Sequence, residues 1–154
     1  MIILFIALAL QFTAYPIDAT PDIKSEMLWK INQIREDGCR CGAKRMPPVE
    51  SVVWNKTLEK SARQHAVDMN RKNYFSHFSR SGADIGKRAQ DAGYRYEKVG
   101  ENIAEGQINV NQVLEDWLDS YDHCILIMNP IFEEMGAARV GYHWVLHFGK
   151  QRNW

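Results

Sequence analysis

The stretch from residue 65 to residue 123 concentrates side chains that bind metals or transfer protons. It contains His65, His77, Glu101 and His123, several of them beside residues that form turns. Neutral imidazole and carboxylate are ligands of zinc and similar borderline metals. They also form a general acid–base pair. Either chemistry requires the fold to bring these groups together, which their spacing alone does not establish.

Each of these residues also has a structural interpretation. His65 lies on or beside the apolar face of a predicted helix, where a core histidine with one backbone hydrogen bond is expected. His77 follows that helix and faces either a cleft or solvent. Glu101 stands in an otherwise apolar segment, so it must be paired, hydrogen-bonded or ligated. A buried network of Glu101 and the histidines that fixes a strand against the helices therefore remains an alternative to a ligand site.

Other chemistries find less support. His143 and His147 are interpreted as strand-edge or surface positions, with His147 pointing outward. Ser76 and Ser120 each lie near a histidine, but neither stands in a nucleophile elbow. A phosphate loop, a dinucleotide fingerprint and a His-Glu-x-x-His helix are also missing from the sequence.

The elements that must position these residues follow from hydrophobic spacing and from capping residues. Apolar residues at helical spacing predict three amphipathic helices, and a short helix of a turn or two is possible before the first strand. Asn55 is expected to cap the second helix, and Gly38 the end of the first. The order of helices followed by a closing hairpin predicts an α+β layered domain. The expected helices span 24–37, 56–73, 85–92 and 110–118, the strands 99–104, 134–142 and 143–149, and a loop 42–53.

Composition limits the compartment and the partners. The chain has 154 residues, enough for one domain, expected over 24–150, and its 19 basic residues balance 19 acidic ones. This balance argues against nucleic-acid binding. The apolar run at 2–10 is too short to span a bilayer and is typical of a secretion signal, expected over 1–19. We expect a secreted or periplasmic, monomeric protein without a membrane span in its mature chain.

Export makes the three cysteines candidates for a disulfide. A bridge from Cys124 to either Cys39 or Cys41 would close a loop of more than 80 residues and stabilise the fold by about 4 kcal/mol. One thiol would then remain free. A metal site of all three cysteines is the weaker alternative, because Cys-x-Cys lacks the usual zinc spacing.

Taken together, the motifs resemble those of the superfamily of cysteine-rich secretory proteins, antigen 5 and pathogenesis-related proteins, and more closely its secreted bacterial branch of SCP-like domains. The resemblance covers residues 24–149. It rests on four motifs in the family's order, namely Ser76-His77, Gly100-Glu101-Asn102-Ile103-Ala104, Trp117-Leu118-x-Ser120-x-x-His123 and Ile127-Met128-Asn129-Pro130, followed by glycine-containing strands.

The resemblance implies a three-layer α-β-α sandwich with a central cleft. In members with the full set, two histidines and two glutamates lie in that cleft, and some members bind divalent metal there. Carried over, the cleft residues are His77, Glu101 and His123. The second glutamate has no counterpart, since Ser120 stands in its place.

Two classes of function follow as hypotheses. The first is a binding module for a divalent metal, a small ligand such as a lipid, or an extracellular peptide or protein. Zn²⁺ would be held by His77 and His123, with Glu101 orienting an imidazole or a bound water. The second is a hydrolase in which Glu101 activates a water. The expected cleft is lined by His77, Glu101, Asn102, Ser120 and His123, and the missing second glutamate favours binding.

Overall fold

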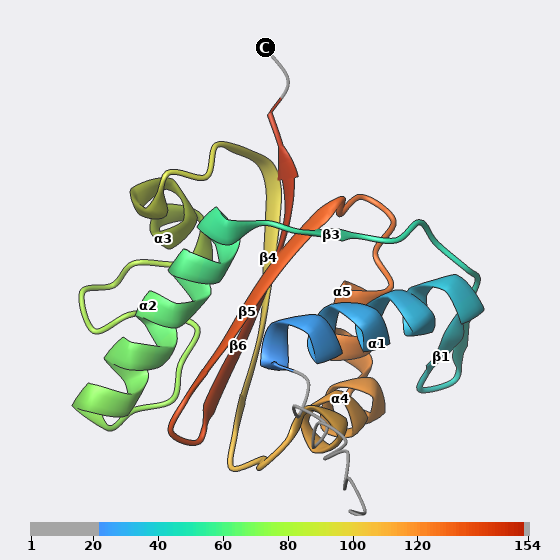
Figure 1. Cartoon of the computed structure of the whole chain (residues 1–154), viewed down its shortest axis with the longest axis horizontal. Coiled ribbons are helices and arrows are strands. Elements are labelled where there is room, and N and C mark those ends of the chain that lie inside the picture. Colours follow the sequence, from blue (N-terminus) through green and yellow to red (C-terminus); the bar gives the residue numbers. More distant parts are fainter. Residues whose placement is uncertain (1–21, 153–154) are drawn as a thin grey trace, which may run out of the picture.

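A computed structural model describes residues 22–152 of the chain. The expected secretion signal lies outside these residues. The described part contains five helices and six strands in the order shown in Figure 1. The helices are α1 (Ile23–Asp37), α2 (Lys56–Lys72), α3 (Ile85–Ala92), α4 (Val110–Asp119) and α5 (Tyr121–Ile127); the strands are β1 (Cys39–Cys41), β2 (Lys44–Met46), β3 (Val53–Trp54), β4 (Tyr96–Glu105), β5 (Glu134–Val140) and β6 (His143–Gln151).

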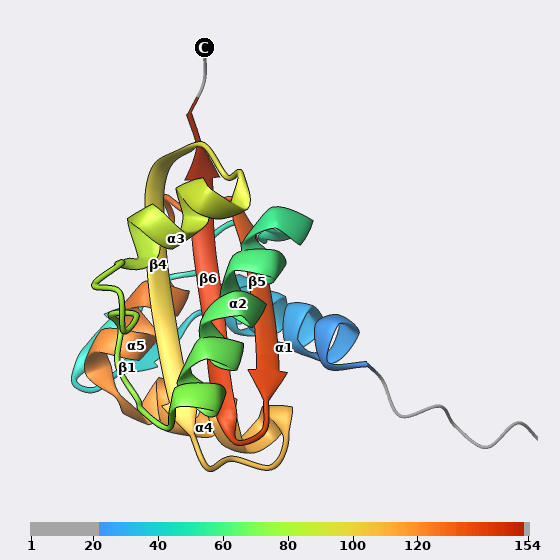
Figure 2. The same cartoon turned by 90° about the vertical axis from the view of Figure 1, so that its left-hand side faces the viewer.

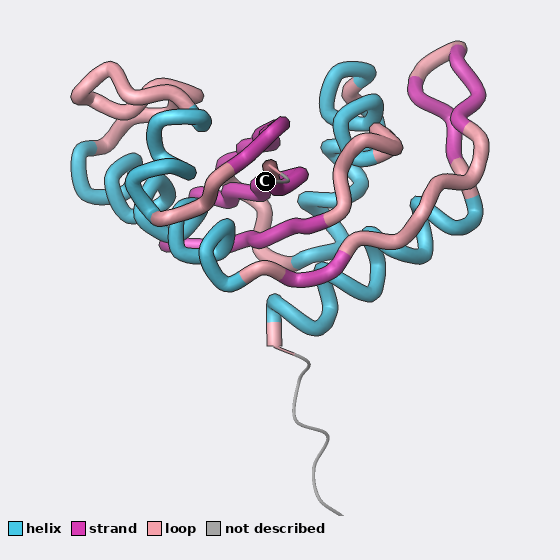
Figure 3. Tube along the Cα trace, turned by 90° about the horizontal axis from the view of Figure 1, so that it is seen from above, coloured by secondary structure: helices cyan, strands magenta, loops and turns pink. Residues whose placement is uncertain are grey.

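The central layer is a four-stranded sheet in the order β3-β5-β6-β4. Strands β4, β6 and β5 are antiparallel, and the short β3 pairs in parallel with β5. Helices α2 and α3 cover one face of this sheet, while α1, α4 and α5 cover the other (Figures 1 and 2). The view from above in Figure 3 shows the sheet between the two groups of helices. This arrangement confirms the α+β class and the three-layer α-β-α sandwich.

Each face of the sheet buries its own apolar cluster. Between the sheet and α2, the apolar cluster includes Ala62, Ala66 and Met69 of the helix together with Ile103 of β4. The larger cluster on the opposite face includes Trp117 of α4, which also donates a hydrogen bond to the carbonyl of Ile103 at 3.1 Å. Because β4 is the last strand of the sheet, this indole satisfies a carbonyl that no neighbouring strand can reach.

Close contact between α2 and β5 depends on Gly136. A Cβ atom at this position would lie 2.6 Å from the carbonyl carbon of Leu58 and 2.8 Å from Cα of Glu59, both backbone atoms of α2. Only glycine permits this approach, since helix backbone cannot yield as a flexible side chain can. Gly136 pairs with His147, which pairs on its other side with Glu101.

The capping predictions hold, whereas the β1–β2 hairpin, the short strand β3 and helix α5 were missed. The side chain of Asn55 accepts hydrogen bonds from the backbone N–H groups of Thr57 and Leu58, as expected of an N-cap. The segment 42–53 is not all loop, because β1 and β2 form a hairpin that turns at Gly42, where φ is +56°. The turn predicted after α4 is instead the short helix α5, which carries His123.

Candidate functional site

Glu101 lies on the edge strand β4 and projects toward α2 and α3. Alternation along the strand sends its neighbour Asn102 to the opposite face, toward α5. There the Asn102 amide donates to the carbonyl of His123 at 3.1 Å. Two adjacent residues of one strand therefore contact both helical layers, and the site is built around the free edge of β4.

The carboxylate of Glu101 is almost fully enclosed, with its side chain 2% exposed. One oxygen, Oε1, accepts a hydrogen bond from Nδ1 of His77 at 2.8 Å. The other, Oε2, accepts from Nη2 of Arg88 at 2.6 Å and from Nε2 of His147 at 2.8 Å. His65 Nε2 lies 4.0 Å from the same oxygen. We call these five residues the Glu101 network.

Charge in the Glu101 network favours the ionised carboxylate. Burial alone would raise the pKa of Glu101, but hydrogen bonds from His147 and His77 and the charge of Arg88 outweigh it, so the pKa lies well below its ordinary value. Burial lowers the pKa of His65 and His147 even though Glu101 opposes the effect. Glu101 is thus a negative charge balanced mainly by Arg88.

His77 stands in the loop that follows α2, and the network holds this loop in place. The helix ends at Lys72 and is capped by Asn73, which has a left-handed φ of +51°. Beyond it, His65 lies 2.9 Å from the carbonyl of Ser76, and Arg88 donates to the carbonyl of His77 at 2.9 Å. The His77 side chain is 53% exposed, and because its Nδ1 faces Glu101, Nε2 is the nitrogen left for a ligand.

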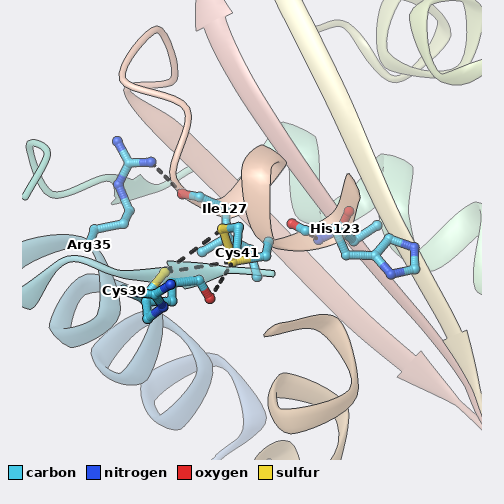
Figure 4. Close-up of a disulfide and its surroundings, with 8 residues drawn as sticks. Arg35, Cys39, Cys41, His123 and Ile127 are labelled. Atoms are coloured by element: carbon cyan, nitrogen blue, oxygen red, sulfur yellow. Dashed lines mark hydrogen bonds between the residues drawn. A yellow bond between two sulfur atoms is a disulfide. The ribbon is translucent and has the colours of Figure 1, made fainter. Parts of the chain in front are cut away.

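His123 occupies the first turn of α5, on the other side of β4. Figure 4 shows its imidazole directed away from the sulfur atoms of the neighbouring disulfide and toward β4. Its Nδ1 is buried and has no hydrogen-bond partner within residues 22–152. Burial lowers the pKa of His123, and the nearby His77 lowers it further, against the opposing charge of Asp122.

The remaining predicted site residues have supporting positions. Asn102 is buried and anchors α5 through the carbonyl of His123. Ser120 is the N-cap residue of α5, and its side chain makes no capping hydrogen bond there. The predicted residues His77, Glu101, Asn102 and His123 are therefore linked around β4, while Ser120 stands at the beginning of the helix that carries His123.

The sequence interpretation of the last two histidines was wrong. His147 is fully buried rather than outward-facing, because its register places it directly opposite Glu101. His143 is also buried and lies 3.1 Å from a carboxylate oxygen of Glu105. Arg88 was missed altogether. A signal for it was available, since an ionised Glu101 in an apolar strand needs a buried cation.

Cys41 and Cys124 form a disulfide with a Cα–Cα distance of 5.4 Å, and Cys39 is a free thiol. The predicted bridge from Cys124 to the Cys-x-Cys segment is thus confirmed, with Cys41 as the partner. These three sulfurs are also the only compact group of three or more potential metal ligands within the described residues. His77, Glu101 and His123 do not form such a group within the described residues.

Comparison with known proteins identifies the family. A model of the cysteine-rich secretory protein family, CAP, matches residues 28–148. The uncharacterized protein YkwD of Bacillus subtilis is 38% identical over 96 residues, which cover 61% of this chain and 37% of that protein. The uncharacterized membrane protein YlbC of the same organism is 26% identical over 100 residues, or 65% of this chain and 29% of that protein. The chain thus spans about a third of the length of these relatives.

Solved structures share the fold. An outer surface protein of Borrelia burgdorferi superposes with a TM-score of 0.74 at 21% identity, over 87% of this chain and 96% of that one. An extracellular protein of Bacillus anthracis with an SCP domain gives a TM-score of 0.69 at 23% identity, over 86% and 44%. Among the described helices, none combines the length and the apolar character needed to cross a membrane. From the match over 28–148, the chain belongs to the cysteine-rich secretory protein family.

Proposed function

We propose that this domain acts outside the cytoplasm as a binding module, and that His77 and His123 hold a divalent metal ion, with Zn²⁺ as the first candidate. The observation that carries the proposal is the 2.8 Å hydrogen bond between Nδ1 of His77 and Glu101. A carboxylate that accepts from one imidazole nitrogen fixes the ring and increases the basicity of the other nitrogen. This is the usual support of a histidine that ligates zinc.

The donor set fits such an ion, although it supplies only two protein ligands. The unpartnered Nδ1 of His123 is a buried polar atom that gains a partner if it ligates, and burial keeps this imidazole neutral, as ligation requires. Zinc has four ligands in most protein sites, so water or the bound molecule would complete the set. We therefore expect weaker binding than at a structural zinc site, with open positions for a further ligand.

Exposed aromatic side chains flank both histidines in the sequence. Phe75 and Phe78 are 47% and 60% exposed on either side of His77, and Tyr121 is 51% exposed two residues before His123. Exposed aromatic residues of this kind are enriched where proteins contact partners. They support an extracellular peptide or a lipid as the molecule that binds beside the metal.

The alternative, a hydrolase with Glu101 as the base, finds less support. Three donors already bind this carboxylate, and its low pKa makes it a weak proton acceptor near neutral pH. Its hydrogen bonds suit a residue that positions His77. The geometry therefore favours binding over hydrolysis.

Calorimetric titration with Zn²⁺ at about pH 7.5, where histidine is mostly neutral, tests the proposal. All proteins should carry Cys39→Ser, because the free thiol is itself a zinc ligand. His77→Ala and His123→Ala are each expected to weaken binding by more than about tenfold. His143→Gln, which alters a histidine paired with Glu105, is the matched control and should leave binding unchanged.

Two results would refute the metal site. One is the absence of zinc-dependent heat in the Cys39→Ser protein. The other is unchanged affinity in the His77→Ala, His123→Ala double variant. Thermal unfolding of every variant shows whether a loss of binding reflects a loss of the fold.

A further inference from the structure

The free thiol of Cys39 lies against the disulfide that ties β1 to α5. Its Sγ is 3.6 Å from Sγ of Cys124 and 4.0 Å from Sγ of Cys41 (Figure 4). We propose that the three cysteines form a thiol–disulfide exchange site, in which Cys39 attacks Cys124 and the bridge moves between Cys41 and Cys39.

The strand explains why both thiols reach the same partner. Residues two apart in a β-strand project to the same face, so Cys39 and Cys41 both point toward α5. An S–S bond is about 2.05 Å long, so the Cys39 sulfur must approach Cys124 by about 1.5 Å. It must also move from beside the Cys124–Cys41 bond into line with it, because the thiolate attacks opposite the sulfur that leaves. Attack on Cys41 is less favourable, because residues two apart in a strand have Cα atoms about 6.6 Å apart, near the upper limit for a disulfide.

Cys39 is also the accessible member of the three. It is partly exposed, whereas Cys41 and Cys124 are fully buried. Cys39 borders a pocket of about 260 Å³ that is also lined by Arg40 and Arg45. Partial burial raises the pKa of the Cys39 thiol. Exchange without a catalyst takes minutes to hours, and we expect this range here.

The reaction balances within the chain. The Cys39 thiol loses its proton, and the thiolate forms a bond to Sγ of Cys124. The bond between Cys124 and Cys41 breaks, its electron pair remains on Cys41, and Cys41 takes up a proton. No external oxidant or reductant is consumed. Both isomers keep α5 tied to the β1–β2 hairpin, and the exchange acts on the residue next to His123.

Trypsin separates the three cysteines, because Arg40 lies between Cys39 and Cys41. The expected peptides are 36–40, 41–44 and 99–139, each with one cysteine. The folded protein is quenched in acid, unfolded, blocked with N-ethylmaleimide at low pH and digested without reduction. Exchange predicts two populations. In one, 36–40 carries the label and 41–44 is linked to 99–139; in the other, 41–44 carries the label and 36–40 is linked to 99–139.

A second sample distinguishes exchange from a fixed mixture made during folding. The native protein is first held with a large excess of iodoacetamide, which reaches Cys39 and not the buried Cys41. Exchange predicts that the population with free Cys41 disappears over minutes to hours as Cys39 is trapped. A population that stays constant contradicts the proposal, as does a free thiol found only on Cys39 in the first sample.

Two variants complete the test. Cys41→Ser should form a Cys39–Cys124 disulfide, detected as 36–40 linked to 99–139 by mass. Cys39→Ser is the control, and it should show the Cys41–Cys124 link alone. If Cys41→Ser is folded and leaves both remaining cysteines free, Cys39 cannot replace Cys41 and the proposal is wrong.

Discussion

Replacing Glu101 by glutamine tests whether the Glu101 network stabilises the domain. Glutamine has nearly the same shape as glutamate, so the change removes the charge without opening a cavity. Arg88, only 8% exposed at its side chain, would lose the carboxylate that balances it at 2.6 Å. Glutamine has one carbonyl oxygen in place of two carboxylate oxygens, so its NH₂ group would face either His77 or the pair His147 and Arg88 and could not accept their hydrogen bonds.

The expected cost follows from the burial of the remaining partner. Breaking a buried ion pair by removing one member costs about 3–5 kcal/mol. Arg88 keeps hydrogen bonds to the carbonyls of His77 and Ala83, so we expect the lower end, a loss of about 3 kcal/mol in the free energy of unfolding. For a domain of this size that lowers Tm by about 10 °C.

Urea unfolding followed by tryptophan fluorescence measures this loss. Glu105→Gln is the matched control, because Glu105 lies on the same strand and also contacts a histidine, but its side chain is 49% exposed. We expect the control to change stability by less than about 0.5 kcal/mol. The double variant Arg88→Met, Glu101→Gln should lose less stability than the two single variants together, by at least about 1 kcal/mol in the free energy of unfolding. If Glu101→Gln is as stable as the control, the charge pair does not support the fold.

Three further predictions concern the fold. The pKa values of His65, His123 and His147 are lowered in the folded state, so the unfolded state binds protons more readily. The free energy of unfolding is therefore highest above about pH 6.5, the pKa of histidine in the unfolded chain, and falls as the pH drops below it. Urea unfolding at several pH values measures this, and a constant or rising stability on acidification would contradict it. Gly136→Ala should cost about 3 kcal/mol by overpacking against the α2 backbone, and a crystal structure with α2 unmoved and a Tm like that of the wild type would refute it. Cys124→Ser removes a bridge spanning 83 residues and should lower the free energy of unfolding by about 4 kcal/mol. Cys41→Ser should lower it by less, because Cys39 can form the bridge to Cys124 instead. Equal losses for the two variants in denaturant titrations would count against that replacement.

The sequence predicted what depends on local spacing. Apolar periodicity and capping residues located the main helices, and Asn55 caps α2 as expected. Family motifs identified Glu101 and His77, which the structure joins by a hydrogen bond. An apolar segment with one carboxylate also correctly indicated that Glu101 is paired.

What the sequence did not predict depends on tertiary register. His147 faces Glu101 only because β6 pairs with β4 in one register, and a shift by one residue would turn it to the opposite face. Arg88 reaches Glu101 from α3, across a fold that no local pattern describes. The choice of Cys41 over Cys39 has a similar cause, because both residues point to the same face of β1.

The state of the His77 ring tests the central claim most directly. Long-range ¹H–¹⁵N correlation of the histidine side chains, recorded at about pH 8 where imidazole is neutral, reports which nitrogen carries the proton. The account predicts a proton on Nδ1 of His77, held by Glu101, and an unprotonated Nε2 whose signal shifts together with that of His123 when Zn²⁺ is added. A proton on Nε2, or histidine signals that zinc leaves unchanged, would contradict it.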